Sequence, residues 1–345
     1  MKRKVMSWIL GAAVSAFAAS AAMAGTLDDV KKNGVLKCGV SQGLIGFSNP
    51  DANNNWTGLD VDFCKAVAAA IFNDASKVKF VPLSAKERFT ALQSGEVDLL
   101  SRNSTWTMSR DTSLGLKFAG VMYYDGQGFM VRKSMNIDSA LKLDGATVCT
   151  NTGTTTELNL ADYFKSHNMK YQVVAIEDDS QVRKAYDEGR CDIFTTDQSG
   201  LYAERLALSK PDDHVILPEI ISKEPLGPVV RQGDDAWFNV VKWTYFALVD
   251  AEDLGVTQAN VGDMMKSPNP EIQRFLGVKN SDGSAAGFGT GIGLDEDWIA
   301  HIVKAEGNYG EVFERNLGMS TNMKIARGKN ALWKDGGLQY GPPIR

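Results

Sequence analysis

Residues 91–100, ALQSGEVDLL, and residues 185–194, AYDEGRCDIF, share the frame Ala-x-x-x-Gly-x-x-Asp followed by apolar residues. Each copy predicts a helix that ends at the glycine, then a tight turn into a short buried strand. Polar side chains follow at matching distances, since Asn103 comes five residues after the first Asp and Asp197 five after the second. The repeat therefore predicts two similar α/β lobes that present polar and charged groups to one cleft.

The chain around each copy alternates between strand and helix patterns. The predicted elements are strands at 35–40 and 77–82, helices at 59–72 and 86–93, strands at 145–148 and 171–176, and a helix at 157–165. Such alternation predicts parallel strands with covering helices, so the expected fold class is α/β.

Two glycine-containing segments, residues 118–129 and 221–230, are predicted to cross between the two series. Two crossings make the second lobe an insertion in the first, joined by a hinge. We therefore predict lobe 1 from residues 25–124 and 226–345, including a C-terminal extension, and lobe 2 from residues 125–225.

The N-terminus has the three parts of a secretory signal peptide: a basic start, MKRK, an apolar run at 5–22, and Ala-Met-Ala at 22–24. An N-terminal membrane anchor is the alternative, because the run is long enough to span a bilayer. We predict cleavage near Ala24 and an exported protein. Cleavage would reduce the 37 basic residues to 34 against 42 acidic ones, a net charge of -8. An acidic chain without a basic stripe argues against nucleic acid as a partner.

Four cysteines follow the signal segment: Cys38, Cys64, Cys149 and Cys191. Export permits disulfides, and the even count fits two. Of three connectivities we predict Cys38 with Cys64 and Cys149 with Cys191, because a bridge between lobes would lock the hinge. Four free buried thiols are the alternative. The chain has no Cys-x-x-Cys pair and its histidines are isolated, so we expect no metal and no cofactor.

Residues 153–157, GTTTE, have the pattern of a capping box at a helix start. The free backbone N–H groups at such a start can bind a carboxylate. An ordinary helix cap without a ligand is the alternative.

Arg110 and Asp197 provide opposite charges. The Arg110 guanidinium, which follows Asn103 and Thr105, can hold a carboxylate through two parallel hydrogen bonds. Its alternative is a surface arginine. Asp197 follows a predicted buried strand, where a lone carboxylate needs a cation such as an α-ammonium. Its alternative is a cap for the helix at 199–208.

Residues 58–71, GLDVDFCKAVAAAI, resemble the signature of the polar amino-acid family of bacterial extracellular solute-binding proteins, family 3. The C-terminal half, ending in ALWKDGGLQY at 331–340, resembles the subgroup of general L-amino-acid-binding periplasmic proteins that serve ABC transporters. The resemblance covers the whole chain after residue 24. It implies a type II periplasmic binding protein fold, in which two lobes, each a sheet flanked by helices, are joined by a two-strand hinge.

The resemblance also implies ligand contacts. Arg110 would clamp the ligand carboxylate, the Thr105 hydroxyl would add a hydrogen bond, and the Asn103 backbone would accept from the ammonium. In lobe 2, Asp197 corresponds to the ammonium-binding acid. The family's Gly-Ser/Thr-Thr turn corresponds to Gly153, Thr154 and Thr155.

Two departures from the family pattern concern the wall of the pocket. Family members with narrow ligand specificity often have an acid and then an aromatic ring after the first strand, where this chain has Ser41 and Leu44. A second aromatic ring of those members would fall near Ala85. Smaller, uncharged walls predict acceptance of varied side chains. Phe47 and Trp106 are the candidates to replace the rings, with packing as their alternative.

We therefore predict a monomeric periplasmic protein that captures varied L-amino acids and delivers them to inner-membrane ABC permease subunits. An exported enzyme on the same scaffold, such as a dehydratase or a cell-wall lyase, is the alternative. Glu87 and Glu157 are the acids nearest the expected cleft, but no set of nucleophile, histidine and acid is apparent. A sensory ligand-binding domain is a third interpretation, and it should be tethered to a membrane span.

Overall fold

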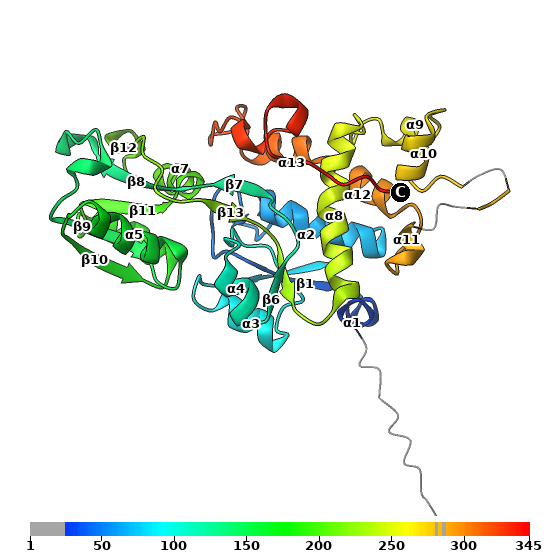
Figure 1. The fold of residues 1–345 in the computed structure, drawn as a ribbon, viewed down its shortest axis with the longest axis horizontal. Helices are drawn as coiled ribbons and strands as arrows, with labels where there is room; N and C mark the ends of the chain where they lie inside the picture. Colours follow the sequence, from blue (N-terminus) through cyan, green and yellow to red (C-terminus); the bar gives the residue numbers. More distant parts are fainter. Residues whose placement is uncertain (1–24, 280–281, 285–287) are drawn as a thin grey trace, which may run out of the picture.

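The computed structural model describes residues 25–279, 282–284 and 288–345. The predicted signal peptide and part of a glycine-rich segment lie outside these ranges. The described chain forms two lobes, each built on a five-stranded sheet, with two crossing strands between them (Figure 1). The predicted two-lobe α/β fold with a two-strand hinge is confirmed.

The sheet of lobe 1 has the order β4-β1-β5-β14-β6. Strand β1 (Leu36–Val40) lies parallel to β4 (Val78–Pro82) and β5 (Leu99–Leu100). Strand β14 (Val229–Arg231) is antiparallel to β5 and to β6 (Leu116–Phe118). Because β14 follows lobe 2 in the chain, lobe 1 is completed only after the chain returns.

The alanine-rich helix α2 (Leu59–Phe72) forms the centre of lobe 1 and packs against α8, α12 and α13. Its small side chains Ala66, Ala68 and Ala70 are buried and permit this close approach. The C-terminal extension therefore adds its core to lobe 1. The other lobe 1 helices are α1 (Thr26–Asn33), α3 (Arg88–Ser94), α4 (Met108–Ser113), α8 (Asp235–Asp253), α9 (Val261–Met264), α10 (Pro270–Phe275), α11 (Phe288–Gly291), α12 (Trp298–Glu306) and α13 (Tyr309–Asn316).

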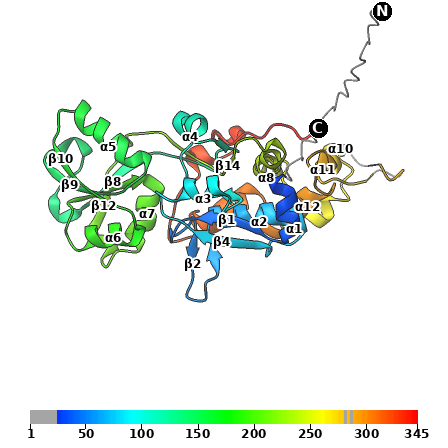
Figure 2. The same ribbon diagram turned by 90° about the horizontal axis from the view of Figure 1, so that it is seen from below.

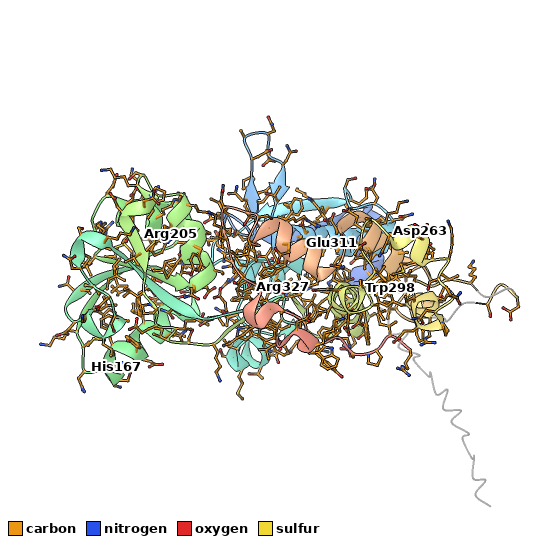
Figure 3. All side chains as sticks on the ribbon, turned by 90° about the horizontal axis from the view of Figure 1, so that it is seen from above. His167, Arg205, Asp263, Trp298, Glu311 and Arg327 are labelled. Carbon is orange, nitrogen blue, oxygen red and sulfur yellow. A yellow bond between two sulfur atoms is a disulfide. The ribbon has the colours of Figure 1, made fainter. Side chains whose placement is uncertain are left out.

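Lobe 2 has the sheet order β10-β9-β11-β8-β12, in which β9 lies parallel to β10 and β11 while β8 is antiparallel to β11 and β12. Its strands are β8 (Gln127–Arg132), β9 (Ala146–Asn151), β10 (Tyr171–Ile176), β11 (Ile193–Asp197) and β12 (His214–Ile216). Its α-helices are α5 (Thr155–Ser166), α6 (Asp179–Asp187) and α7 (Gln198–Leu206). With all side chains drawn, lobe 2, which carries His167 and Arg205, is the smaller body (Figure 3).

The hinge consists of β7 (Tyr123–Asp125) and β13 (Glu224–Leu226), which pair antiparallel. The predicted lobe boundaries, at 124/125 and 225/226, fall within these strands and stay a prediction. A small hairpin of β2 (Asn49–Pro50) and β3 (Trp56–Thr57) projects from lobe 1 (Figure 2).

The repeated sequence unit makes the same contacts in both lobes. Gly95 and Gly189 follow helices α3 and α6 with φ values of 79° and 83°, a conformation that glycine adopts without a steric cost. The carboxylates of Asp98 and Asp192 then accept backbone N–H groups in β1 and β9, at 2.9 and 2.8 Å. Each aspartate therefore fixes the turn to the neighbouring strand, which gives the repeat a structural role.

The two disulfides are confirmed as predicted. Cys38 and Cys64 join β1 to α2, and Cys149 and Cys191 join β9 to the turn before β11. Neither bridge crosses the hinge. Within the described ranges, no three His, Cys, Asp or Glu residues gather as metal ligands, and no helix has the length and apolarity needed to cross a membrane.

Candidate functional site

A cleft between the lobes gathers five of the predicted site residues. These are Asn103, Thr105, Thr154, Thr155 and Asp197. The cleft is also lined by the predicted small wall residues Ser41, Leu44 and Ala85. Loops after β5 and β11 and the start of α5 supply the polar lining, so the carboxyl ends of strands from both sheets meet at the cleft.

Arg110, on α4, is only 7% exposed, so the surface alternative is wrong. Its Nη1 donates to the Thr105 carbonyl at 2.8 Å, and its guanidinium lies 4.8 Å from the centre of the Phe89 ring. Burial lowers the pKa of Arg110 to about 10, although the charges of Glu224 and Asp197 oppose that shift. Among the described residues, Arg110 forms no ion pair within 4.0 Å. The guanidinium thus lies behind Thr105, and Arg110 itself is not among the residues that line the cleft.

Asp197 ends β11 and is buried, yet its side chain makes no capping bond to α7. The helix-cap alternative is therefore wrong. Burial raises the pKa of Asp197 well above its usual value, and the carboxylates of Asp125 and Glu224 add to the shift. Burial likewise raises the pKa of Asp125 to about 6, although Ser199 donates to it. A cation entering here would relieve the repulsion between these carboxylates.

Thr154 caps α5, as predicted, by accepting the Glu157 backbone N–H at 3.3 Å. Glu157 reaches back to the Gly153 N–H, not to that of Thr154, so the capping box is only half formed. Gly153 has a φ of 77°, and a Cβ there would lie 3.1 Å from the Lys86 Cα of lobe 1. Gly153 thus lets the two lobes approach closely at the start of α5.

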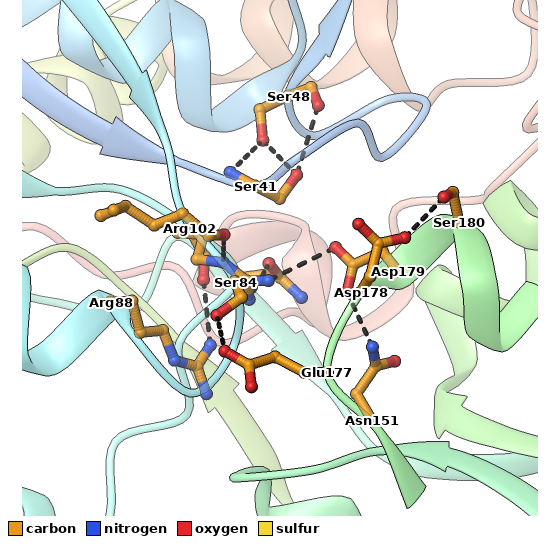
Figure 4. A network of polar contacts seen from close by, with 12 residues as sticks. Ser41, Ser48, Ser84, Arg88, Arg102, Asn151, Glu177, Asp178, Asp179 and Ser180 are labelled. Carbon is orange, nitrogen blue, oxygen red and sulfur yellow. Dashed lines mark hydrogen bonds and ion pairs between the residues drawn. The ribbon is translucent and has the colours of Figure 1, made fainter.

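Two further arginines of lobe 1 line the cleft and were missed from the sequence. Arg102 is 3% exposed and pairs with Asp179 of lobe 2 at 3.4 Å (Figure 4). Arg88 is equally buried, and its Nη1 reaches only the Arg102 carbonyl at 3.4 Å. The Arg88 Nε has no hydrogen-bond partner among the described atoms, and Arg88 forms no ion pair there. Burial, followed by the charges of Arg110 and Arg102, holds the pKa of Arg88 well below its usual range.

The lobes also touch at the rim of the cleft. Glu177 of lobe 2 accepts from Ser84 at 3.1 Å (Figure 4). Glu177 also pairs with Lys86 at 3.2 Å. The rim pair is largely exposed, whereas Arg102 and Asp179 are shielded. The lobes are therefore joined directly by one shielded ion pair inside the cleft and one exposed ion pair at its rim.

Phe47 and Trp106 lie outside the cleft lining. Phe47 is 1% exposed and packs edge-on against Tyr123, with ring centres 5.5 Å apart. Trp106 is 41% exposed and stacks on Phe118 at 5.7 Å. These contacts describe packing, and a ligand role for either ring stays a prediction.

Glu224, on hinge strand β13, is the buried acid that sequence reasoning missed. It is 1% exposed and accepts hydrogen bonds from the hydroxyls of Thr105, at 2.6 Å, and Thr155, at 2.9 Å. Its only sequence signal was an acid within a predicted crossing, which does not reveal these partners.

Residues 36–258 match the family model of the bacterial extracellular solute-binding proteins, family 3. The chain belongs to this family. Members bind solutes and the close relatives are not enzymes, so the enzyme alternative has no support.

Among relatives of this family 3 protein, the general L-amino acid-binding periplasmic protein AapJ of Rhizobium johnstonii is 61% identical, with both chains covered in full. The glutamate/glutamine/aspartate/asparagine-binding protein BztA of Rhodobacter capsulatus is 56% identical over 96% of this chain and 97% of its own. A periplasmic binding protein from Brucella ovis, solved with glutathione bound, matches with a TM-score of 0.91 and 60% identity. That match covers 93% of this chain and all of the other.

Proposed function

We propose that this protein captures L-amino acids with broad specificity and delivers them to the permease of an ABC transporter. One observation carries the proposal: buried Asp197 of lobe 2 lines the cleft, buried Arg110 of lobe 1 lies behind the lining residue Thr105, and neither has an ion-pair partner among the described residues. The carboxylate and ammonium of an amino acid supply the two missing charges. The relatives AapJ and BztA, both named for binding amino acids, support this choice of ligand.

The carboxylate would bind Arg110 and the backbone N–H of Thr155 at the start of α5. The ammonium would bind the Asp197 carboxylate and the Asn103 carbonyl. The Thr105 hydroxyl donates to Glu224, and while it does so its oxygen offers only lone pairs to the cleft. A carboxylate bound beside Arg110 would take over this donor, which is the role that the family resemblance implies for Thr105. Both ligand charges would then be paired, which makes burial of a zwitterion tolerable.

The unpaired guanidinium of Arg88 supports ligands that carry a second anionic group. BztA is named for glutamate and aspartate, which carry such a group, and also for their neutral amides. The small wall residues Ser41, Leu44 and Ala85 leave room for other side chains. Acidic amino acids are accordingly the best ligands within a broad set.

A short peptide such as glutathione is a second candidate ligand. A further cavity, bounded by Gln42 and Asn49 of lobe 1 and Ser180 of lobe 2, shares Leu44 and Asp179 with the cleft. The extra space could hold the rest of a peptide whose first residue occupies the cleft. The glutathione complex of the Brucella ovis protein supports this candidate.

Periplasmic location, cleavage near Ala24 and action as a monomer belong to the same proposal. A ligand held by both lobes favours the closed arrangement, and a permease could then distinguish loaded from empty protein.

Calorimetric titration of protein stripped of ligand by unfolding and refolding tests the proposal. Titrants are the twenty L-amino acids and glutathione, with Arg110→Met and Asp197→Asn as variants. Exposed Arg190→Met and Asp212→Asn are matched controls. We expect several amino acids to bind wild type and both controls, with binding abolished in both cleft variants. Absence of amino-acid binding to wild type would refute the proposal.

A further inference from the structure

The second cavity adjoins one particular side of the cleft. It has a volume of about 280 Å³ and shares Leu44, Asp179 and Glu204 with the cleft lining. Leu44 belongs, with Ser41 and Ala85, to the small wall that the proposed function assigns to the ligand side chain. Since one water needs only about 10 to 15 Å³ of such space, the second cavity has room for many atoms. A ligand side chain that passes Leu44 can therefore continue into this cavity.

The second cavity has polar groups that suit a peptide chain. Gln42 and Asn49 of lobe 1 and Ser180 of lobe 2 line it with neutral donors and acceptors. Its buried acid Glu204 already pairs with Arg183 at 3.0 Å. The cavity thus offers hydrogen bonds to the amide groups of an extended ligand.

The other sides of the cleft are closed to an extended ligand. Thr105, Arg110 and Glu224 are all buried where the α-carboxylate would bind. An amide formed at the α-carboxylate would remove the charge that pairs with Arg110 and would direct the chain into these side chains. A substituent on the α-ammonium would likewise meet buried Asp197. A longer ligand therefore fits only when it grows from its side chain.

We propose that the cleft and the second cavity together bind γ-glutamyl peptides, in which the glutamate side chain forms the amide bond, and reject the α-linked isomers. The inference rests on the proposed amino-acid function and deepens it by naming the linkage that a bound peptide must have. A γ-linked peptide keeps its α-ammonium for Asp197 and its α-carboxylate for Arg110. The Arg88 Nε, which has no partner among the described atoms, can donate to the γ-carbonyl as it would to a free γ-carboxylate.

The experiment titrates ligand-stripped wild type with L-glutamate, γ-L-glutamyl-glycine and α-L-glutamyl-glycine. The two dipeptides have the same atoms and the same charges, so only the linkage differs. We expect the γ isomer to bind with a Kd within about tenfold of that for L-glutamate. The α isomer should bind about a hundredfold more weakly or worse, because it leaves buried Arg110 without its carboxylate.

Equal Kd values for the two isomers, or a preference for the α isomer, would overturn the inference. A γ isomer that fails to bind while L-glutamate binds would also overturn it and would leave the proposed function standing. A wild-type protein that binds no amino acid would instead refute the proposed function, and the inference with it.

Ala207→Trp tests the second cavity directly. Ala207 is exposed and lines the second cavity but not the cleft, so an indole there fills only the space for the extension. The Kd for the γ isomer should rise about tenfold or more, while that for L-glutamate changes less than about threefold. Ala175→Trp, at an exposed position of the same lobe outside both cavities, is the matched control and should change neither constant. An equal effect of Ala207→Trp on both titrants, or no effect on either, would contradict the role of the second cavity.

Discussion

The two lobes share one structural unit and differ in the residues that come directly after it. In lobe 1 the unit ends at Asp98 and β5, and the next turn leads to Arg110. In lobe 2 the unit ends at Asp192 and β11, whose last residue is Asp197. The repeated glycine and aspartate build the same turn twice, while the residues beyond the strand supply opposite charges. Fold and recognition are therefore carried by adjacent but separate residues.

The disulfides provide the largest test of this comparison, because each belongs to one lobe. Replacing Cys38 and Cys64 by alanine should lower the unfolding free energy by about 3.5 kcal/mol, and replacing Cys149 and Cys191 by about 4 kcal/mol, since the second closes the longer loop. Denaturant titration measures the losses. Differential hydrogen exchange should localise each loss to its own lobe; a loss shared equally between lobes would contradict their independence.

Much of this organisation was predictable from the sequence because it depends on local spacing. Helix ends at glycine, the alternation of strands and helices around the repeat, and the cysteine pairs all follow from short patterns and the need for a free hinge. The burial of Arg88 and the bonds of Glu224 depend on segments far apart in the chain, so their sequence signals resemble those of surface charges. Phe47 illustrates a related limit, since an aromatic residue of a pocket wall and one of the core look alike in sequence.

The two depths of contact between lobes provide the next test. Asp179→Asn leaves the buried Arg102 guanidinium unpaired, so closure should weaken and the Kd for L-glutamate should rise about tenfold or more. Glu177→Gln removes the exposed rim pair with Lys86 and should change the Kd less than about fivefold. Calorimetry compares the variants. Equal effects would mean that burial does not distinguish the two contacts.

Proton release on ligand binding should distinguish Asp197, the cleft acid of lobe 2, from buried acids of lobe 1 that lie away from the cleft, such as Asp250. The raised pKa of Asp197 keeps part of the free protein protonated there, whereas an ammonium ligand needs the ionised form. The affinity for an amino acid should therefore rise as pH rises through the pKa of Asp197. At pH values below that pKa, ligand binding should release a proton from Asp197. Titration in buffers of different ionisation enthalpy measures the release.

The matched control for proton release is Asp250→Asn, because burial raises the pKa of Asp250 to about 7 far from the cleft. This variant should retain the release, and Asp197→Asn should lose it.

The stability of the free protein should depend on pH in the opposite sense to ligand affinity. Carboxyls with folded pKa values raised above 3.8, such as Asp125 at about 6, contribute stability below pH 4 that is lost as pH rises to about 6. A free protein whose melting temperature is insensitive to the Asp125→Asn change across pH 4 to 6 would contradict this assignment.

The smallest expected effect compares two glycines of lobe 2. Gly153→Ala and Gly145→Ala both place a side chain at positive φ, at 77° and 80°, and each should cost about 1 to 2 kcal/mol of stability. Only the Cβ at 153 meets lobe 1, near Lys86, so only Gly153→Ala should also weaken ligand binding, by a few-fold. Thermal melts and calorimetry separate the two effects. An equal loss of affinity in Gly145→Ala would mean that close approach of the lobes is not the cause.

Ligand-dependent closure is the most direct test that a zwitterion is shared between Arg110 and Asp197. Small-angle X-ray scattering would measure the radius of gyration of ligand-stripped protein before and after saturating L-glutamate. The account predicts a smaller radius for wild type and no change for Arg110→Met or Asp197→Asn. Full closure of either variant would contradict it, because one lobe alone would then suffice to hold the ligand.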